Sequence, residues 1–248
     1  MNIISSSYGN DSVAMIQWCY ENQVEAIVVY IDTGWAAEEW SDRVNSCEHW
    51  ARDMGFKTVQ IRPEVQFQQL MRDKKGFPNQ RFQWCSGMLK GIPFLNFVDK
   101  IDPDGEAIVL VGKRRVESRE RSETPAVTKS EYHGDRLLMH PLYRHTDADR
   151  DELIARTPFT VLEHRSLECS PCVNANAGDF KILSASDIAK VAALEAEIGK
   201  TMFRPKRHNG AQGIRQVIDW AKYGQGKYDP DQQDLFNMGC GSPFGCGL

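Results

Sequence analysis

Long apolar runs are missing from this 248-residue sequence. No stretch approaches the roughly 18 consecutive apolar residues that a membrane-spanning helix needs, so the sequence predicts no such span. The first residues also lack a basic region followed by an apolar segment, which argues against a secretory signal and for a cytoplasmic protein. With 41% hydrophobic residues, the chain nevertheless has enough apolar side chains to bury a full core.

An excess of positive charge is also lacking. The 30 Lys and Arg residues face 34 Asp and Glu residues, and the net charge of −4 disfavours a protein that coats nucleic acid over its whole surface. A local basic groove is compatible with this balance, because four arginines cluster between residues 114 and 121. We therefore expect a small anionic substrate, with nucleic acid as the less favoured partner.

Cysteines are few for the length of the chain. Seven cysteines cannot supply a disulfide scaffold for 248 residues, so each is expected to be a core thiol, a metal ligand or a catalytic group. Cys19 and Cys47 lie on apolar helical stretches and are predicted to be core. The other five lie in Trp84-Cys85, in Glu168-Cys169-Ser170-Pro171-Cys172 and in a glycine-rich tail that carries Cys240 and Cys246.

These five thiols are enough for a four-thiolate site with one cysteine left over. A [4Fe-4S] cluster, a structural zinc and a redox dithiol all fit that count, with zinc the less favoured metal. Cys85 stands at a predicted helix start, where the helix dipole and Lys90 would favour its thiolate form.

The N-terminal stretch has the layout of an anion cradle. A short apolar strand runs into Ser5-Ser6-Ser7-Tyr8-Gly9-Asn10-Asp11-Ser12, and a helix begins at once. Backbone N–H groups at a helix start attract anions, and glycine lets a phosphate approach the backbone closely. Neither the Walker spacing G-x-x-x-x-G-K-[ST] nor the dinucleotide fingerprint G-x-G-x-x-G is present.

Buried strands alternate with helices through the first half of the chain. Strands are predicted over residues 26–31, 58–61 and 107–112, and helices over 11–22, 36–54 and 86–99. This alternation predicts an α/β fold, a mostly parallel sheet with helices on both faces, and ligands then bind beyond the carboxyl ends of the strands. Further helices are predicted over residues 147–156, 186–199 and 210–222.

An arginine-rich loop follows the fourth predicted strand directly. Gly112-Lys113-Arg114-Arg115 and the arginines after it suit a phosphate or sulfate, which Arg binds through paired hydrogen bonds. A second basic cluster, over residues 204–207, is expected to close over the same anion.

Together these stretches resemble the phosphoadenosine phosphosulfate (PAPS) reductase family of the PP-loop, or adenine-nucleotide α-hydrolase, superfamily. Ser7-Tyr8-Gly9-Asn10-Asp11-Ser12 is similar to its S-[FY]-G-K-[DE]-S loop, Asp32-Thr33-Gly34 to its D-T-G, and Gly112-Lys113-Arg114-x-x-Glu117-Ser118 to its G-x-R-x-x-E-S. The resemblance implies a Rossmann-like PP-loop domain over residues 1–165, with a helical, cysteine-bearing region over residues 166–248 packed on it.

The resemblance also implies a set of site residues. It implies that an adenine nucleotide (PAPS, APS or ATP) contacts Ser5, Ser7, Tyr8, Gly9, Asn10, Asp11, Ser12, Asp32, Thr33, Gly34, Gly112, Arg114, Arg115, Glu117 and Ser118. It implies a [4Fe-4S] cluster in members with paired cysteine motifs, here on Cys85, Cys169, Cys172 and Cys240. The nucleophile would be Cys240 or Cys246.

Three departures from the family pattern change what is expected. Asn10 replaces the lysine of the loop, so Arg114 or a neighbour would have to supply that charge. Trp84-Cys85 stands where cluster-bearing reductases have Cys-Cys, so the fourth ligand would come from the tail. The tail keeps Cys-Gly at positions 240 and 246 without the acidic and histidine neighbours of the reductase E-C-G-x-H segment.

Three functions fit these expectations. The first is a sulfonucleotide reductase that releases sulfite with the help of a thiol reductant. The second is an ATP-dependent sulfurtransferase that adenylates a nucleotide, tRNA or DNA oxygen and receives sulfur from a donor protein or a cluster. The third is a non-catalytic nucleotide or cluster sensor, and a homodimer is compatible with all three.

Overall fold

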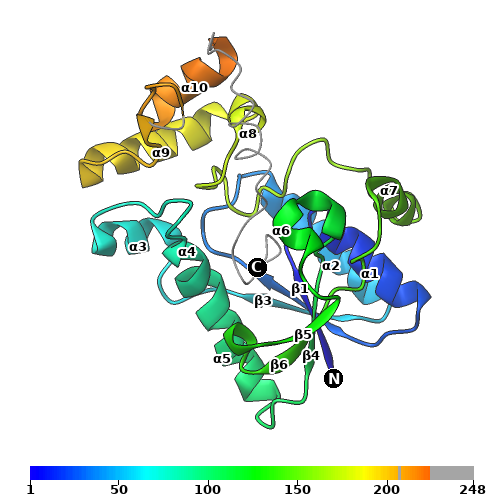
Figure 1. Cartoon of the computed structure of the whole chain (residues 1–248). Coiled ribbons are helices and arrows are strands. Elements are labelled where there is room, and N and C mark those ends of the chain that lie inside the picture. Colours follow the sequence, from blue (N-terminus) through cyan, green and yellow to red (C-terminus); the bar gives the residue numbers. More distant parts are fainter. Residues whose placement is uncertain (206–207, 224–248) are drawn as a thin grey trace.

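The computed structural model describes residues 1–205 and 208–223. A six-stranded sheet forms its centre, in the order β3-β2-β1-β4-β6-β5 (Figure 1). Every neighbouring pair is parallel except β5 and β6, which are antiparallel. The strands are β1 (Asn2–Ser6), β2 (Ile27–Ile31), β3 (Lys57–Ile61), β4 (Ile108–Val111), β5 (Val127–Ser130) and β6 (Arg136–Met139). The predicted mostly parallel α/β sheet is confirmed.

Helices cover both faces of the sheet. The longer helices of the described chain, on the sheet and beyond it, are α1 (Asn10–Glu21), α2 (Trp40–Asp53), α3 (Phe67–Lys74), α5 (Ile92–Ile101), α7 (Asp147–Ala155), α9 (Ala185–Ile198) and α10 (Gly213–Tyr223). One core cluster joins α1, α2 and α7 to residues such as Ile4, Val28 and Leu110 of the sheet. A second joins α5 to the alternate strand residues, such as Ile3 and Val109. The β-branched runs form buried strands because both of their faces are covered.

Shorter helical segments complete the described chain. They are α4 (Trp84–Ser86), the π-helical turn η1 (Gly87–Gly91), the 3-10 turns η2 (Arg115–Glu117) and η3 (Glu131–His133), α6 (Arg119–Ser122) and α8 (Ala177–Lys181). Helical geometry therefore runs from Trp84 to Ile101, with the π-helical turn just before Pro93, which has no N–H for a regular helical bond.

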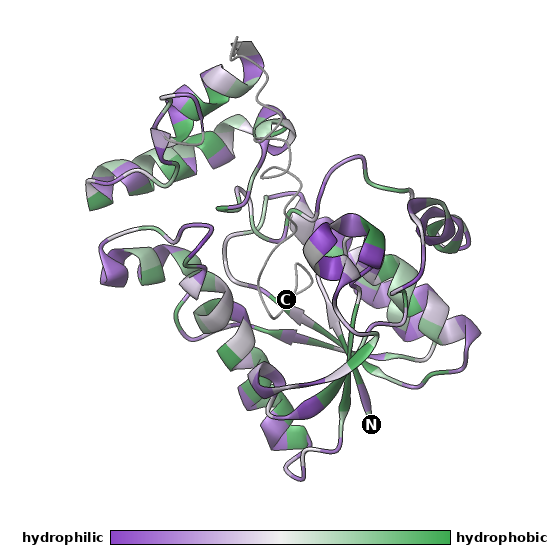
Figure 2. Ribbon diagram, viewed as in Figure 1, coloured by the Kyte–Doolittle hydropathy of each residue, from purple (hydrophilic) through white to green (hydrophobic). Residues whose placement is uncertain are grey.

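A third apolar cluster lies beyond the sheet. Phe180, Val191, Leu194 and Val217 of α8, α9 and α10 pack there with Phe67 and Met71 of α3, and the helices stand apart from the sheet in Figure 1. Figure 2 shows green and purple residues interleaved along α9 and α10, as expected for helices with one buried face. Within the described residues, no helix is long and apolar enough to cross a membrane.

Sheet topology fixes where a ligand can bind. The chain moves outward from β1 through β2 to β3 and then returns to pair β4 with the other side of β1. The loops after β1 and β4 consequently diverge to opposite faces, which opens a crevice at their carboxyl ends. The loop after β1 is Ser7–Gly9, and the loop after β4 begins at Gly112.

Candidate functional site

A cavity of about 480 Å³ opens at this crevice. Most of the residues expected to bind the nucleotide or a metal line it: Ser7, Gly9, Asn10, Asp11, Ser12, Thr33, Cys85, Gly112, Arg114, Glu117, Cys169 and Cys172. Six others named from the sequence do not line it: Ser5, Tyr8, Asp32, Gly34, Arg115 and Ser118. The fold thus brings stretches more than 150 residues apart in the sequence to one cavity.

The loop after β1 is shaped by its own serines. The Ser7 N–H donates to Ser12 Oγ at 3.1 Å, and the Gly9 N–H donates to Ser7 Oγ at 3.3 Å. Tyr8 has a left-handed backbone (φ 57°), and its ring is fully buried against Tyr30, so this side chain is part of the core. Among the described residues no side chain caps the start of α1 at Gly9, so the helix N-terminus faces the cavity with uncapped backbone N–H groups.

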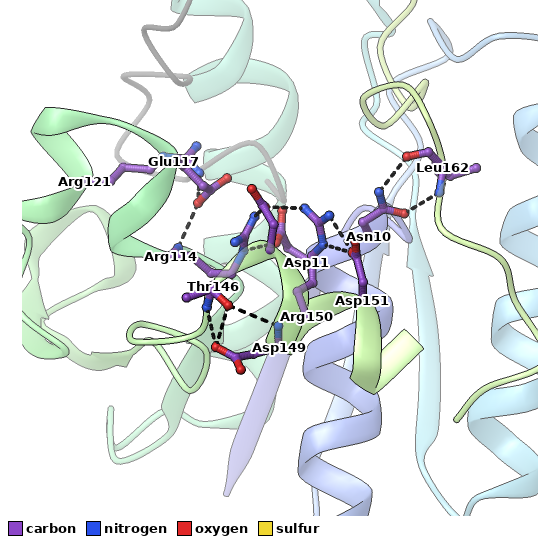
Figure 3. Close-up of polar contacts among 11 residues, drawn as sticks. Asn10, Asp11, Arg114, Glu117, Arg121, Thr146, Asp149, Arg150, Asp151 and Leu162 are labelled. Carbon is purple, nitrogen blue, oxygen red and sulfur yellow. Dashed lines mark hydrogen bonds and ion pairs between the residues drawn. The ribbon is translucent and has the colours of Figure 1, made fainter. Parts of the chain in front are cut away.

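Asn10 is engaged with a distant segment of backbone. Its Nδ2 donates to the Leu162 carbonyl and its Oδ1 accepts from the Leu162 N–H, both at 2.9 Å (Figure 3). A Cβ on Gly9 would lie 3.1 Å from Ser166 Cβ, so the same segment passes closely over the loop. We call residues 157–168 the strap. At the position where the resembled loop has a lysine, Asn10 therefore holds the strap over the cradle by two hydrogen bonds.

Arg114 braces the cavity wall. Its Nε donates to Asp11 Oδ1 at 2.5 Å and its Nη2 to Asp147 Oδ1 at 2.9 Å, joining the ends of β4, α1 and α7 (Figure 3). The side chain is almost fully buried, and within the described residues its Nη1 has no hydrogen-bond partner. Two carboxylates already balance this guanidinium, so little of its charge is left to replace the missing lysine.

The three residues of the Asp32-Thr33-Gly34 turn have different roles. Asp32 accepts from the Gly34 N–H at 2.9 Å and from Arg62 Nη2 at 2.6 Å, so its carboxylate fixes the turn. Gly34 has φ +69°, and a Cβ there would lie 2.6 Å from Gln66 Oε1. Thr33 is the member that reaches the cavity, and its buried Oγ1 has no hydrogen-bond partner among the described residues. A buried hydroxyl without a partner is suited to a ligand contact.

Cys85, Cys169 and Cys172 border the same cavity and pack against the third apolar cluster. The C-x-x-C segment is held by Trp35, whose carbonyl accepts from the Ser170 N–H at 2.8 Å and whose Nε1 donates to the Pro171 carbonyl at 3.1 Å. Among the described residues, no three or more His, Cys, Asp or Glu side chains form a group ready to hold a metal ion.

The protonation of these thiols differs from the sequence-based expectation. Burial, reinforced by neighbouring Cys172, raises the pKa of Cys85 to about 12, and Lys90 opposes this only in part. The reason is that Lys90 Nζ lies 2.7 Å from Glu168 Oε1, where the carboxylate balances its charge. The hydrogen bond to Cys172 and then burial raise the pKa of Cys169. Without a metal, Cys85 is therefore a thiol, and the expected thiolate is wrong.

Several other predicted residues lie elsewhere. Cys240 and Cys246 lie outside the described residues, as do two of the four residues in the 204–207 cluster, while Arg204 lines a different cavity. Arg115 is exposed and stacks over the Tyr143 ring at 5.8 Å. Cys19 and Cys47 are fully buried in the core, as predicted.

Sequence reasoning missed part of the cavity wall. The strap, Arg150 and the residues around Asn174 all line it. Arg150 belongs to α7 and contacts Asp147 and Asp151, an arrangement set by helix packing and without a motif in the sequence (Figure 3). The sequence did contain a signal for Glu168. This carboxylate stands directly before the C-x-x-C, where it could have been predicted to pair with Lys90.

The chain is similar to known proteins in one structural comparison and one family comparison. A crystal structure of phosphoadenylyl-sulfate (PAPS) reductase from Candida auris, in a phosphate complex, is similar with 13% identity and a TM-score of 0.48, covering 64% of this chain and 74% of that one. No curated protein sequence matches the chain. The family model described as the phosphoadenosine phosphosulfate reductase domain matches residues 1–163, about two thirds of the sequence. The chain therefore belongs to the phosphoadenosine phosphosulfate reductase domain family.

Proposed function

We propose that this protein binds a sulfonucleotide, PAPS or APS, and reduces its sulfur to sulfite. The observation that carries the proposal is that the Ser7–Ser12 loop, Thr33 and the thiols Cys85, Cys169 and Cys172 share one cavity of about 480 Å³. Membership of the PAPS reductase domain family supports an adenine nucleotide as the ligand. The α1 N-terminus and the serine hydroxyls suit the phosphosulfate oxygens.

Lys113 lines the cavity and brings positive charge close to the cradle, whereas Arg150, which also lines it, is paired with Asp147 and Asp151. In this proposal Lys113 attracts the phosphosulfate, Thr33 Oγ1 donates to the nucleotide, and Arg114 acts through Asp11 by holding the start of α1 in place. The buried Arg114 guanidinium can hold the start of α1 rigidly because it joins β4, α1 and α7 at once.

The proposed chemistry is nucleophilic. A thiolate of Cys240 or Cys246 attacks the sulfate sulfur, an S–S bond forms, and the S–O bond breaks with its electron pair leaving on the phosphate oxygen. One thiol of a dithiol reductant then attacks the enzyme sulfur, and sulfite departs as a mixed disulfide forms. The second reductant thiol attacks the reductant sulfur of this bond, which releases the enzyme thiolate and leaves the reductant as a disulfide. Cationic groups near the cradle would stabilise the departing phosphate.

A metal group is part of the proposal. The donor chemistry fits, since Cys85, Cys169 and Cys172 are soft ligands at one cavity wall, and Cys240 would complete the set. When bound, a [4Fe-4S] cluster would supply redox-active iron near the nucleotide. Metal analysis and the absorption spectrum of anaerobically purified protein test this, with Cys172→Ser expected to lose metal and Cys47→Ser to keep it.

Sulfite release tests the reaction itself. The full chain should release sulfite from PAPS or APS in the presence of a dithiol reductant, and the double variant Cys240→Ser/Cys246→Ser should not. Cys47→Ser, a substitution of a buried core thiol, is the matched control for general damage. Equal sulfite from the wild type and the double variant would overturn the proposal.

An ATP-dependent sulfurtransferase is the second candidate. The observation that favours it is that three thiols among the described residues line the cavity, and three protein ligands would leave one cluster position for a sulfur atom. In this reaction an acceptor oxygen attacks the α-phosphate of ATP, pyrophosphate leaves, and sulfur then displaces AMP. Release of pyrophosphate from ATP separates the candidates, because the reductase consumes no ATP.

A further inference from the structure

A second cavity, of about 510 Å³, lies between the end of α3 and the segment that follows α9. These two helices pack on each other beyond the sheet, on the side away from α1 and α7 (Figure 1). Its walls include Lys74, Lys75, Lys200 and Arg204, together with the aromatic rings of Phe77 and Trp84. Among the residues that the structure describes, no carboxylate lines it. We call this cavity the basic groove.

The basic groove carries four cationic side chains. All four cationic side chains are exposed, and within the described residues none of them forms an ion pair with a carboxylate. Lys200 Nζ donates to the Lys75 carbonyl at 2.8 Å, which ties the two sides of the groove together. The nearby carboxylate of Glu197 is already held by Arg72 at 2.6 Å. Four cations that no described carboxylate pairs with, in a chain of net charge −4, favour a polyanion as the ligand of this groove.

The two aromatic residues add a second kind of contact. Phe77 and Trp84 are half-buried, so each packs one side on the third apolar cluster and presents another to the groove. Rings held in this way are stacking platforms for unpaired bases, and a positively charged groove beside them follows the phosphate backbone. An acidic protein would use the cations but not the stacking surface.

From this combination we infer that the basic groove binds single-stranded nucleic acid. Duplex DNA does not suit the groove, because its stacked bases are not available to Phe77 and Trp84. Trp84 lines the groove while the adjacent Cys85 lines the main cavity, so a bound strand lies beside the thiol set. The inference is independent of which sulfur reaction the main cavity performs, since it concerns binding alone.

Fluorescence anisotropy with labelled oligothymidylate and oligouridylate of about 20 nucleotides tests the inference on the full chain. If four cations each neutralise a phosphate, the plot of log K against log salt has a slope of about −2.8. The variant Lys74→Gln/Lys200→Gln should bind at least about tenfold more weakly and lose about 1.4 of that slope. Comparing the two probes distinguishes RNA from DNA as the source of the strand.

Lys57→Gln/Lys100→Gln, which removes two exposed lysines away from the groove, is the matched control and should bind like the wild type. Phe77→Leu keeps the apolar packing and should weaken binding without changing the salt slope. Equal losses in the two double variants, or no binding of either oligonucleotide, would overturn the inference. So would tighter binding of polyglutamate or of a duplex of equal length, which would indicate an acidic protein or a shape-dependent site.

Discussion

Asn10 has the most unusual side-chain role in the cradle. It occupies the lysine position of the family loop, yet both of its polar atoms are bonded to the Leu162 backbone. An amide can donate and accept at once, which a lysine cannot, so only an amide at this position closes both bonds. The residue change that removes the lysine charge from the loop thus also supplies the two hydrogen bonds that hold the strap.

Replacing Asn10 tests the clamp. Asn10→Ala removes two hydrogen bonds, and at about 0.5–1.5 kcal/mol each the free energy of unfolding should fall by about 1–3 kcal/mol. Urea unfolding measures this, and limited proteolysis should cut the strap faster. Asn2→Ala, which removes one exposed bond to the Glu25 carbonyl, is the control. An equal loss in both variants would show that Asn10 does not clamp the strap.

His133 gives the protein a defined pH response. It is fully buried, its Nδ1 pairs with Ser130 Oγ at 2.8 Å, and burial, with Lys113, His140 and Arg136 nearby, lowers its pKa to about 4. The unfolded chain binds a proton below about pH 6.5 while the folded one does not, so stability falls as pH drops toward 4.

When the pH falls from about 7 to about 5, His133 should lower the free energy of unfolding by about 2 kcal/mol. Urea unfolding at both pH values measures the loss, which should be smaller in His133→Gln. His49→Gln, at an exposed position, should keep the wild-type pH dependence. An unchanged pH dependence in His133→Gln would refute this assignment.

At the scale of elements, the approach of β4 to α1 determines the cradle. A Cβ added at Gly112 would lie 3.2 Å from the Asp11 carbonyl oxygen, so the end of β4 touches the first turn of the helix. The Arg114–Asp11 pair then locks this contact. The strand end, the helix start and the Ser7–Gly9 loop are therefore held together as one unit.

Gly112→Ala should separate these elements. Overpacking here should lower the free energy of unfolding by about 1–3 kcal/mol and weaken adenine-nucleotide binding, which calorimetric titration measures. Gly87→Ala is the matched control, because a Cβ there meets nothing within 4 Å. If the two variants bind nucleotide equally well, the close approach does not matter for the site.

At the scale of the whole molecule, two packed regions meet at the thiols. The sheet carries the cradle, whereas Cys85, Cys169 and Cys172 pack against the cluster formed by α3 and α8–α10. Trp35 joins the regions, since its ring stacks on Phe67 at 4.3 Å and its backbone holds Ser170. The C-terminal helices therefore support one wall of the main cavity.

Phe180 tests this dependence. It is 1% exposed and meets Phe203 edge-on at 4.8 Å, so Phe180→Ala should cost about 3–5 kcal/mol. Cys169 and Cys172 should then react faster with an alkylating reagent, as mass spectrometry would show. Tyr20→Ala, at a half-exposed ring on α1, is the control. Unchanged thiol reactivity in Phe180→Ala would mean that the two regions are independent.

Local patterns in the sequence were sufficient for the sheet and for the place of the cradle. Runs such as Val28-Val29-Tyr30-Ile31 predict buried parallel strands because apolar residues on both faces need cover, and topology then puts the loops after β1 and β4 together. The family resemblance carried by these loops is confirmed by the domain match over residues 1–163. The nucleotide contacts and the roles of Cys240 and Cys246 stay predictions.

Only the tertiary structure decided which polar side chains are already held in hydrogen bonds or ion pairs. Asn10 and Arg114 look like free polar groups in the sequence, but partners 152 and 33 residues away engage them. The same holds for Cys85, whose pKa depends on the burial and on the Lys90–Glu168 pair. A motif specifies residue types at short spacing, whereas charge balance and burial depend on contacts between distant segments, which only the folded chain brings together.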